Sequence, residues 1–218
     1  MQTLPQPQFN AAPWRLSGRV LGVALNDPAA LAALGDAVHA PPYKAPPRTP
    51  VLYVKPRNTL VANGSTLAQE LTGVELGATL GLVIGQASSA VPVAQALQHV
   101  AGCLLVADLS LPHDSWYRPA VRAKARDGSC VLGPLVAPVD PASTVLEVCV
   151  DGEPVQRVAL AQMQRGAAQL LAEVSEFMTL QPGDLLLLGL AASAPRLRAG
   201  QSFSITAPGL GRLQGSLA

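Results

Sequence analysis

Charged and aromatic residues gather in one window of the chain, from Asp108 to Pro134. The whole chain is only 13% charged, yet this window combines carboxylates, cationic side chains and aromatic rings: Asp108, His113, Asp114, Trp116, Tyr117, Arg118, Arg122, Lys124, Arg126 and Asp127. It follows the apolar run GCLLVA, a pattern typical of a strand that ends in a polar loop. Such a loop could bind a small anionic ligand, although a solvated loop with salt-bridged ends would have the same composition.

Size and composition limit the classes of function. A chain of 218 residues is long enough for one domain with a large core. Its net charge of +1 creates no field that would attract nucleic acid or an anionic membrane. No apolar run reaches the roughly 18 residues of a membrane span, and the first residues lack the basic start and apolar stretch of a secretory signal. We therefore expect a cytoplasmic protein with neither nucleic acid nor membrane as a partner.

The cysteines and the turn-forming residues constrain the fold. Cys103, Cys130 and Cys149 are odd in number, and their spacing fits neither a disulfide framework nor a Cys-x-x-Cys metal site, so we expect buried free thiols. The chain contains 20 Pro and 19 Gly, which must separate many short segments. This composition favours a strand-rich fold over a helical bundle.

Apolar runs and their spacing predict short strands and a few helices. We expect strands at 18–25, 51–54 and 102–110 and within 180–190, a hairpin turn at Asp151-Gly152, and a strand pair at the end of the chain. Helices are expected at 27–38, with Asp27 as N-cap, at 92–102, and at 163–174, where apolar residues recur at helical spacing. Residues 40–50 are Pro-rich and should be extended.

The window around Asp108 resembles the fumarylacetoacetate hydrolase family, whose members carry an N-D-x-S strand end, then a Lys, an Asp and a G-P turn. Here these are ADLS at 107–110, Lys124, Asp127 and Gly133-Pro134. Within that family, the segments PPYKAPPRTPVLYVKPRNT, SLPHDSWYRPAVRAKARDG and SEFMTLQPGD are most similar to the N-terminal half, or subunit, of the bifunctional isomerase/decarboxylases of 4-hydroxyphenylacetate (homoprotocatechuate) degradation. The similarity extends from about Val20 to Leu217.

The resemblance implies a fold and a domain organisation. The expected fold is a single α+β domain dominated by a mixed, rolled β-sandwich with a few short covering helices, and the many short strands support it independently. Residues 1–50 would form an N-terminal strand, a short helix and a Pro-rich arm packed on the main body. Residues 51–218 would form the fumarylacetoacetate hydrolase-like domain.

The resemblance also implies a reaction and the roles of individual residues. Family members decarboxylate 2-hydroxy or 2-oxo dienoic acids or shift their double bonds. The expected function is that of a subunit of a 5-oxopent-3-ene-1,2,5-tricarboxylate decarboxylase / 2-hydroxyhepta-2,4-diene-1,7-dioate isomerase in aromatic catabolism. The substrate would be a small polyanionic acid. The candidate catalytic residues are Asp108, Lys124 and Asp127, and the candidate substrate-binding residues are Lys55, Arg118, Arg122 and Gln156.

The metal site of the family is incomplete in this sequence. Active members, which use Mg²⁺ or Mn²⁺, resemble E-x-E-L-x-V-V-I-G where this chain has Gly77 and Thr79 in place of the two Glu. Glu75 lies two residues earlier, about 6.6 Å away along a strand. Asp108 is then only a weak candidate ligand, because one carboxylate seldom holds such an ion. We predict no tightly bound metal, which suits isomerisation better than decarboxylation.

Two further family features are missing. Active relatives carry a His and a Glu in the first helix, where this chain has Ala30 and Ala33, and they end a later strand with T-G-T-P where this chain has Leu188 to Ala191. His39 lies near enough in sequence to replace the missing His, but a lone His before a Pro-rich loop is more often a surface residue. The alternative function is therefore a catalytically degenerate partner that stabilises a metal-bearing sister subunit. Either function implies a homodimer or a heteromer with a C-terminal sister subunit.

Overall fold

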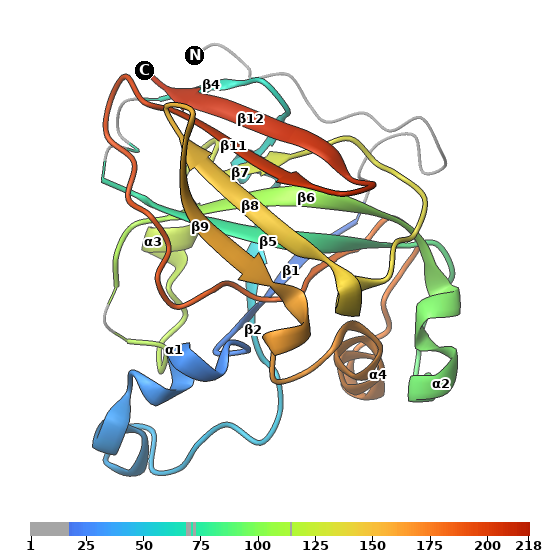
Figure 1. Ribbon diagram of the computed structural model, residues 1–218. Helices are drawn as coiled ribbons and strands as arrows, with labels where there is room; N and C mark the ends of the chain where they lie inside the picture. Colours follow the sequence, from blue (N-terminus) through green and yellow to red (C-terminus); the bar gives the residue numbers. More distant parts are fainter. Residues whose placement is uncertain (1–17, 69–70, 72, 114) are drawn as a thin grey trace.

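The computed structural model describes residues 18–218 except 69, 70, 72 and 114. Two β-sheets face each other, with short helices at one end of the molecule (Figure 1). Strands of the smaller sheet contact the two central strands of the larger one, so the main core lies between the sheets. Leu105, Leu146 and Ile205 are fully buried there.

The larger sheet has seven strands in the order β2-β1-β10-β5-β6-β7-β3. Their bounds are β1 Val20–Ala24, β2 Val51–Lys55, β3 Leu60–Ala62, β5 Glu75–Ile84, β6 Val100–Ser110, β7 Cys130–Leu132 and β10 Leu185–Leu187. Strands β5 and β6 are antiparallel, and Gly77 lies opposite Asp108 in their register. Almost every residue of both strands is buried, as the continuous apolar run of β6 predicts.

The smaller sheet has five strands in the order β4-β12-β11-β8-β9. Their bounds are β4 Thr66–Leu67, β8 Val145–Val150, β9 Glu153–Ala159, β11 Ser202–Ala207 and β12 Gly211–Leu217. The β8–β9 hairpin turns at Asp151 and Gly152, which both have positive φ. Two successive residues of this kind are typical of a tight two-residue hairpin turn, so the predicted turn is confirmed.

The helices are short. They are α1 Pro28–Ala32, α2 Val93–Ala96, α3 Val121–Lys124 and α4 Ala167–Phe177, with 3₁₀ turns η1 Gly35–His39, η2 Arg57–Thr59, η4 Leu97–His99, η5 Pro141–Ser143 and η6 Leu160–Gln162. Asp27 caps α1 by accepting a hydrogen bond from the Ala29 amide. Its other carboxylate oxygen accepts one from the amide of Ala192, 2.7 Å away, which ties α1 to the chain after β10. No helix among the described residues is long and apolar enough to span a membrane.

The predicted α+β fold is confirmed, with differences in detail. The helix expected at 92–102 is wrong beyond residue 99, because Val100 pairs with Ile84 and begins β6. The helix expected from Met163 begins only at Ala167, after a 3₁₀ turn. The strand expected within residues 1–50 is β1, which lies inside the larger sheet between β2 and β10. Residues 18–50 and the rest of the chain therefore share one sheet.

Gly77 illustrates how closely the strands of the larger sheet approach their neighbours. A Cβ atom at residue 77 would lie 2.8 Å from Leu190 Cδ2 and 2.9 Å from the carbonyl oxygen of Asp108. We expect Gly77→Ala to lower the free energy of unfolding by about 1–3 kcal/mol, because overpacking of this kind forces neighbours to move. In a Leu190→Ala background the loss should be smaller. Urea unfolding of the four proteins would measure both, and equal losses in the two backgrounds would contradict this packing.

Candidate active site

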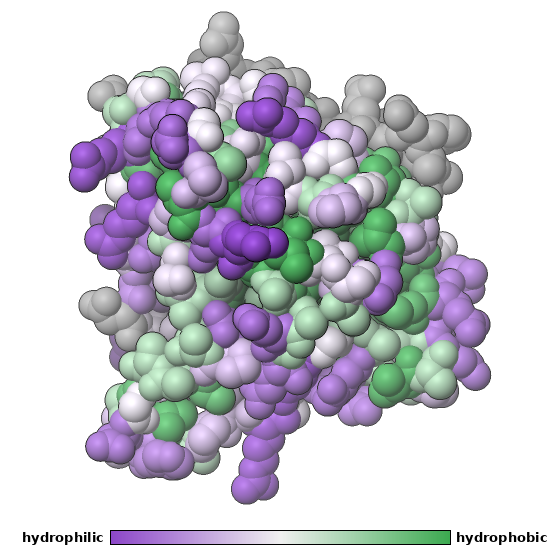
Figure 2. Space-filling model, in the orientation of Figure 1, coloured by the Kyte–Doolittle hydropathy of each residue, from purple (hydrophilic) through white to green (hydrophobic). Residues whose placement is uncertain are grey.

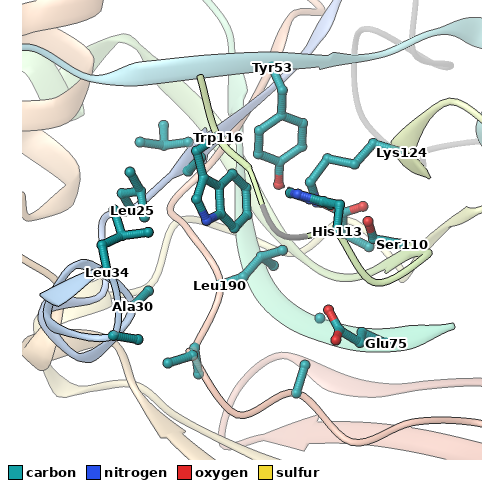
Figure 3. Close-up of a pocket in the computed structure, with 18 residues that line it drawn as sticks. Leu25, Ala30, Leu34, Tyr53, Glu75, Ser110, His113, Trp116, Lys124 and Leu190 are labelled. Carbon is teal, nitrogen blue, oxygen red and sulfur yellow. The ribbon is translucent and has the colours of Figure 1, made fainter. Parts of the chain in front are cut away.

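A cavity of about 230 Å³ opens where β2, β5 and β6 meet helix α1. Figure 3 shows two sides to it: Tyr53, Lys124, His113 and Ser110 gather on one, and Leu25, Ala30 and Leu34 lie on the other. Trp116 and Leu190 stand between them. The full lining among the described residues is Val23, Ala24, Leu25, Ala30, Ala33, Leu34, Tyr53, Glu75, Gly77, Asp108, Ser110, His113, Trp116, Lys124, Leu190, Ala191, Ala192 and Ala194.

The Asp108 carboxylate is the centre of the polar side. It is fully buried near the end of β6. The Lys55 ammonium lies 2.9 Å from Oδ1, and the Lys124 ammonium lies 3.3 Å from Oδ2. The Tyr53 hydroxyl donates a hydrogen bond to Oδ2. Two cations and one phenol therefore surround a single buried anion.

Lys55 is held as a structural cation. Its ammonium donates to the carbonyl oxygens of Leu109 and Lys124 and to the Ser129 hydroxyl. These three acceptors use its three N–H bonds, so Asp108 Oδ1 is paired by charge and lacks an aligned hydrogen-bond donor. Because Lys55 is absent from the cavity lining, it acts from behind the site.

Lys124 faces the cavity. The short helix α3 delivers it, and its ammonium also lies over the Tyr53 ring, 4.2 Å from the centroid. This cation–π contact and the Asp108 carboxylate hold a long, flexible side chain in one position. An ammonium has three N–H bonds and only one is directed to Asp108, so the others are available to a ligand.

Burial and the ion pairs shift the pKa values of this cluster in different directions. Burial lowers the pKa of Lys124 below its ordinary value of 10.5, and the Asp108 charge only partly opposes this. Burial alone would raise the pKa of Asp108, but Lys124, Lys55 and the Tyr53 hydrogen bond outweigh it and hold the pKa at about 2. Burial, together with the neighbouring Asp108 charge, raises the pKa of Tyr53 well above 10. Near neutral pH, Asp108 is therefore a fixed anion, and Lys124 is the better candidate for proton transfer.

The opposite side of the cavity is apolar. Helix α1 contributes Ala30 and lies next to Ala33, which also lines the cavity, so the two positions of the missing His–Glu pair present methyl groups. His39 is exposed and is not among the lining residues. Both methyl groups of Leu190 lie over Gly77, within 2.9 Å of where a Cβ would stand.

The residues of this site do not fit a divalent cation. Thr79 is buried away from the cavity, and Glu75 lies opposite Ser110 rather than Asp108 and pairs with Arg196 at 3.5 Å. The Asp108 oxygens already face two ammonium groups and a phenol. Within the described part of the chain, no group of three or more His, Cys, Asp or Glu is placed to hold a metal ion. Hard cations need several oxygen ligands, which this site does not offer.

The structure brings three of the predicted residues together and places four elsewhere. Lys55, Asp108 and Lys124 form one cluster. Four others are absent from the described lining of the cavity: Arg118, Arg122, Asp127 and Gln156. Asp127 is exposed and accepts a hydrogen bond from Asn58, and Gln156 donates to the carbonyl of Ser193, beside lining residues of the chain after β10. We therefore assign no direct role in this cavity to any of these four predicted residues. The three cysteines are free, and Cys149 is only partly buried.

Sequence reasoning did not single out Tyr53, although a signal for it exists. In a strand, side chains two residues apart point to the same face, so Tyr53 shares the site face of β2 with Lys55. Trp116 and His113 fall within the predicted polar loop, and their rings meet edge-on at 4.4 Å. No local pattern reveals which of the many loop residues would turn towards the cavity.

Comparison with known proteins gives the family. The sequence matches the family described as "Fumarylacetoacetate (FAA) hydrolase C-terminal" over residues 19–218. The 4-hydroxyphenylacetate degradation bifunctional isomerase/decarboxylase of Salmonella dublin is 40% identical over 200 residues, which are 91% of this chain and 47% of that protein. The chain thus spans about half the length of the bifunctional relatives it matches.

Two solved structures share the fold. The 2-hydroxyhepta-2,4-diene-1,7-dioate isomerase of Mycobacterium marinum is 28% identical with a TM-score of 0.76, over 93% of this chain and 75% of that one. The fumarylpyruvate hydrolase of Pseudomonas aeruginosa, solved with Mn²⁺ and pyruvate, is 25% identical with a TM-score of 0.79, over 97% and 94% of the two chains. With a family match that runs from residue 19 to the last residue, the chain belongs to the fumarylacetoacetate hydrolase family.

Proposed function

We propose that this protein isomerises a 2-hydroxy or 2-oxo acid by moving a proton, with Lys124 as the proton-transfer residue. The observation that carries the proposal is the Lys124 side chain itself: it is buried, it lines the cavity, and its pKa is lowered. Enzymes use amines with lowered pKa values as acids and bases near neutral pH. The names of the relatives, an isomerase/decarboxylase and an isomerase, support the same class of reaction.

The acid would bind with its carboxylate and its C2 oxygen towards Lys124. Both groups accept hydrogen bonds, and the neutral Lys124 amine that later takes the proton has two N–H bonds, one for Asp108 and one for the acid. An enolate formed during the reaction would place its negative charge beside the same cluster of cations. Stabilisation of that charge by groups already fixed in place lowers the barrier.

Lys124 would then move one proton in two steps. The neutral Lys124 amine takes a proton from one carbon as that C–H bond breaks and the double bonds shift, and the resulting ammonium returns the proton to another carbon. No net charge is gained or lost. Asp108, Lys55 and Tyr53 are positioning residues in this scheme, because they hold Lys124 in place and do not exchange protons themselves.

Isomerisation fits these residues better than decarboxylation. In relatives with a complete site, a divalent ion would polarise the 2-oxo acid as a Lewis acid, whereas the donor set here does not fit such an ion. The cluster has one cation in excess over its carboxylate, which suits the modest charge of an enolate. We therefore propose a role in the isomerase branch of aromatic acid catabolism, consistent with the relatives.

Replacement of Lys124 tests this proposal. We expect Lys124→Met to lower kcat/KM for a 2-hydroxydienoate by about 100-fold or more, the usual effect of losing a positioned acid–base. In the unaltered protein, kcat/KM should rise with pH through an inflection below 10.5, because the lowered pKa populates the amine form earlier than in a free lysine. Lys44→Met, at an exposed lysine, is the control. Retention of activity in Lys124→Met, by an absorbance assay on a variant shown to be folded, would refute the role.

Metal independence is a separate test. After dialysis against a chelator, we expect the melting temperature and the isomerase activity to remain unchanged, and added Mg²⁺ or Mn²⁺ to raise neither, because an ion that binds the folded state would stabilise it by mass action. The same titration on a family member with the complete carboxylate set is the control. A stabilisation by Mn²⁺ that Asp108→Asn abolishes would contradict the prediction.

A second candidate function is that of a non-catalytic partner for another domain of this family. Ala30 and Ala33, which line the cavity where active relatives carry the acid–base pair, favour it. Apolar side chains are exposed near α2 and α4: Val93, Leu97 and Phe177 are 52%, 42% and 61% exposed. Figure 2 shows apolar side chains in this region, at the lower right. We propose that a second copy or a sister subunit covers them.

Light scattering after size-exclusion chromatography tests the association. We expect a mass of at least twice that of one chain, either alone or after co-expression with a neighbouring family member. Phe177→Glu should shift the protein towards the monomer, because it places a charge in the apolar contact. Val155→Glu, at an exposed valine of β9, should not. A complex that gains isomerase activity only through the sister subunit, even with Lys124→Met in this chain, would favour the partner function.

A further inference from the structure

We propose that Trp116 forms the wall against which the conjugated chain of the acid lies, and that Tyr43 is the positioning residue that holds this wall in place. The inference rests on the proposed function for the reaction and adds two residues to the binding of the acid. Tyr43 belongs to the Pro-rich segment 40–50 and is 73 positions from Trp116 in sequence, so only the fold brings the two together.

Trp116 has the largest side chain in the described lining of the cavity. Its indole ring stands between the polar side at Lys124 and the apolar side at α1 (Figure 3). An acid held at Lys124 would therefore extend past this ring. A dienoic acid is planar where its double bonds are conjugated, and flat π systems pack favourably on aromatic rings.

The backbone of Trp116 is held from outside the cavity by Tyr43. The Trp116 amide donates a hydrogen bond of 2.8 Å to the Tyr43 hydroxyl oxygen. The same hydroxyl lies 3.5 Å from Ser115 Oγ, which accepts a hydrogen bond from the Tyr117 amide at 3.3 Å. The rings of Tyr43 and Tyr117 meet edge-on, with 6.2 Å between their centroids. Each of residues 115–117 therefore has a contact with Tyr43.

These contacts matter because the loop has no regular structure of its own. Residues 115–120 form neither helix nor strand, and most of them are exposed. In such a segment the position of a side chain depends on tertiary contacts. Tyr43 is absent from the described lining of the cavity, so it would act on the acid only through Trp116.

The segment that carries Tyr43 is suited to this task. It contains five prolines in residues 40–50, and proline restricts the backbone. It is also anchored to the main body, because the carbonyl oxygen of Arg48 accepts a hydrogen bond of 2.8 Å from the buried Arg165. Tyr43 therefore presents its hydroxyl from a restrained and anchored segment.

Tryptophan fluorescence tests the positioning. The chain has two tryptophans, so Trp14→Phe leaves Trp116 as the only one. In that background we expect Tyr43→Phe to raise the acrylamide quenching constant of Trp116 by about two-fold or more, because the loop loses a hydrogen bond that keeps it closed. Tyr117→Phe, which removes the hydroxyl of the exposed ring in the same pair, should leave the constant unchanged. An unchanged constant in Tyr43→Phe would overturn its role.

The same fluorescence tests whether Trp116 contacts the acid. We expect saturation with 2-oxoadipate, a stable 2-oxo dicarboxylic acid, to lower the quenching of Trp116 in the Trp14→Phe protein. Tyr43→Phe should raise the Kd of this acid by about three- to ten-fold, the equivalent of one net hydrogen bond. An acid that leaves the quenching unchanged would overturn the placement of Trp116.

A double-mutant cycle separates positioning from stability. Trp116→Leu keeps an apolar side chain but removes the flat ring, and it should raise the Kd by about ten-fold in isothermal titration. In that background Tyr43→Phe should raise the Kd no further, whereas the losses of stability in urea unfolding should add, because the amide that bonds Tyr43 remains. A Kd that Tyr43→Phe raises by the same factor in both backgrounds would overturn the inference.

These measurements do not depend on turnover, so they distinguish this inference from the proposed function. If Lys124→Met retains isomerase activity while Tyr43→Phe raises the quenching and the Kd, only the proposed function is refuted. If Lys124→Met loses activity while Tyr43→Phe changes neither quantity, only the inference is overturned.

Discussion

One buried carboxylate organises the site. Asp108 stands in the longest strand pair of the larger sheet, without contact to water, and it is tolerated there only because two ammonium groups and a phenol compensate for the lost hydration. The residues that surround Asp108 come from distant parts of the chain: Lys55 and Tyr53 from β2, and Lys124 from α3. Residues separated by more than fifty positions in sequence are therefore held at one point by charge as well as by packing.

The same cluster separates the roles of its members. A carboxyl group whose pKa is about 2 remains ionised throughout the neutral range and supplies a constant field. That field keeps Lys124 next to the cavity, while burial makes its proton easier to release. The same buried environment therefore keeps Asp108 ionised near neutral pH and makes Lys124 easier to deprotonate.

Much of the fold and part of the site could be predicted from the sequence. Alternation, apolar runs and turn residues identified most strands and the Asp151-Gly152 hairpin, because these signals are local. Lys55, Asp108 and Lys124 were found through their motifs. The positions of Arg118, Arg122 and Asp127 could not be predicted, because the path of an irregular loop depends on tertiary contacts that no local spacing encodes. Tyr53 was overlooked because it lies in an otherwise hydrophobic strand, where its aromatic ring suggests a core residue rather than one that uses its hydroxyl group.

The hydrogen bonds of Asp27 have a consequence for how a ligand reaches the cavity. One carboxylate oxygen caps α1 and the other holds the amide of Ala192, two residues after Leu190. The apolar wall at α1 and the chain segment that carries Leu190 are thereby joined by a single side chain. If α1 moved, the backbone that carries Leu190 would move with it. The two apolar walls of the cavity would then shift together. Asp27 therefore couples the position of α1 to that of the chain segment that carries Leu190.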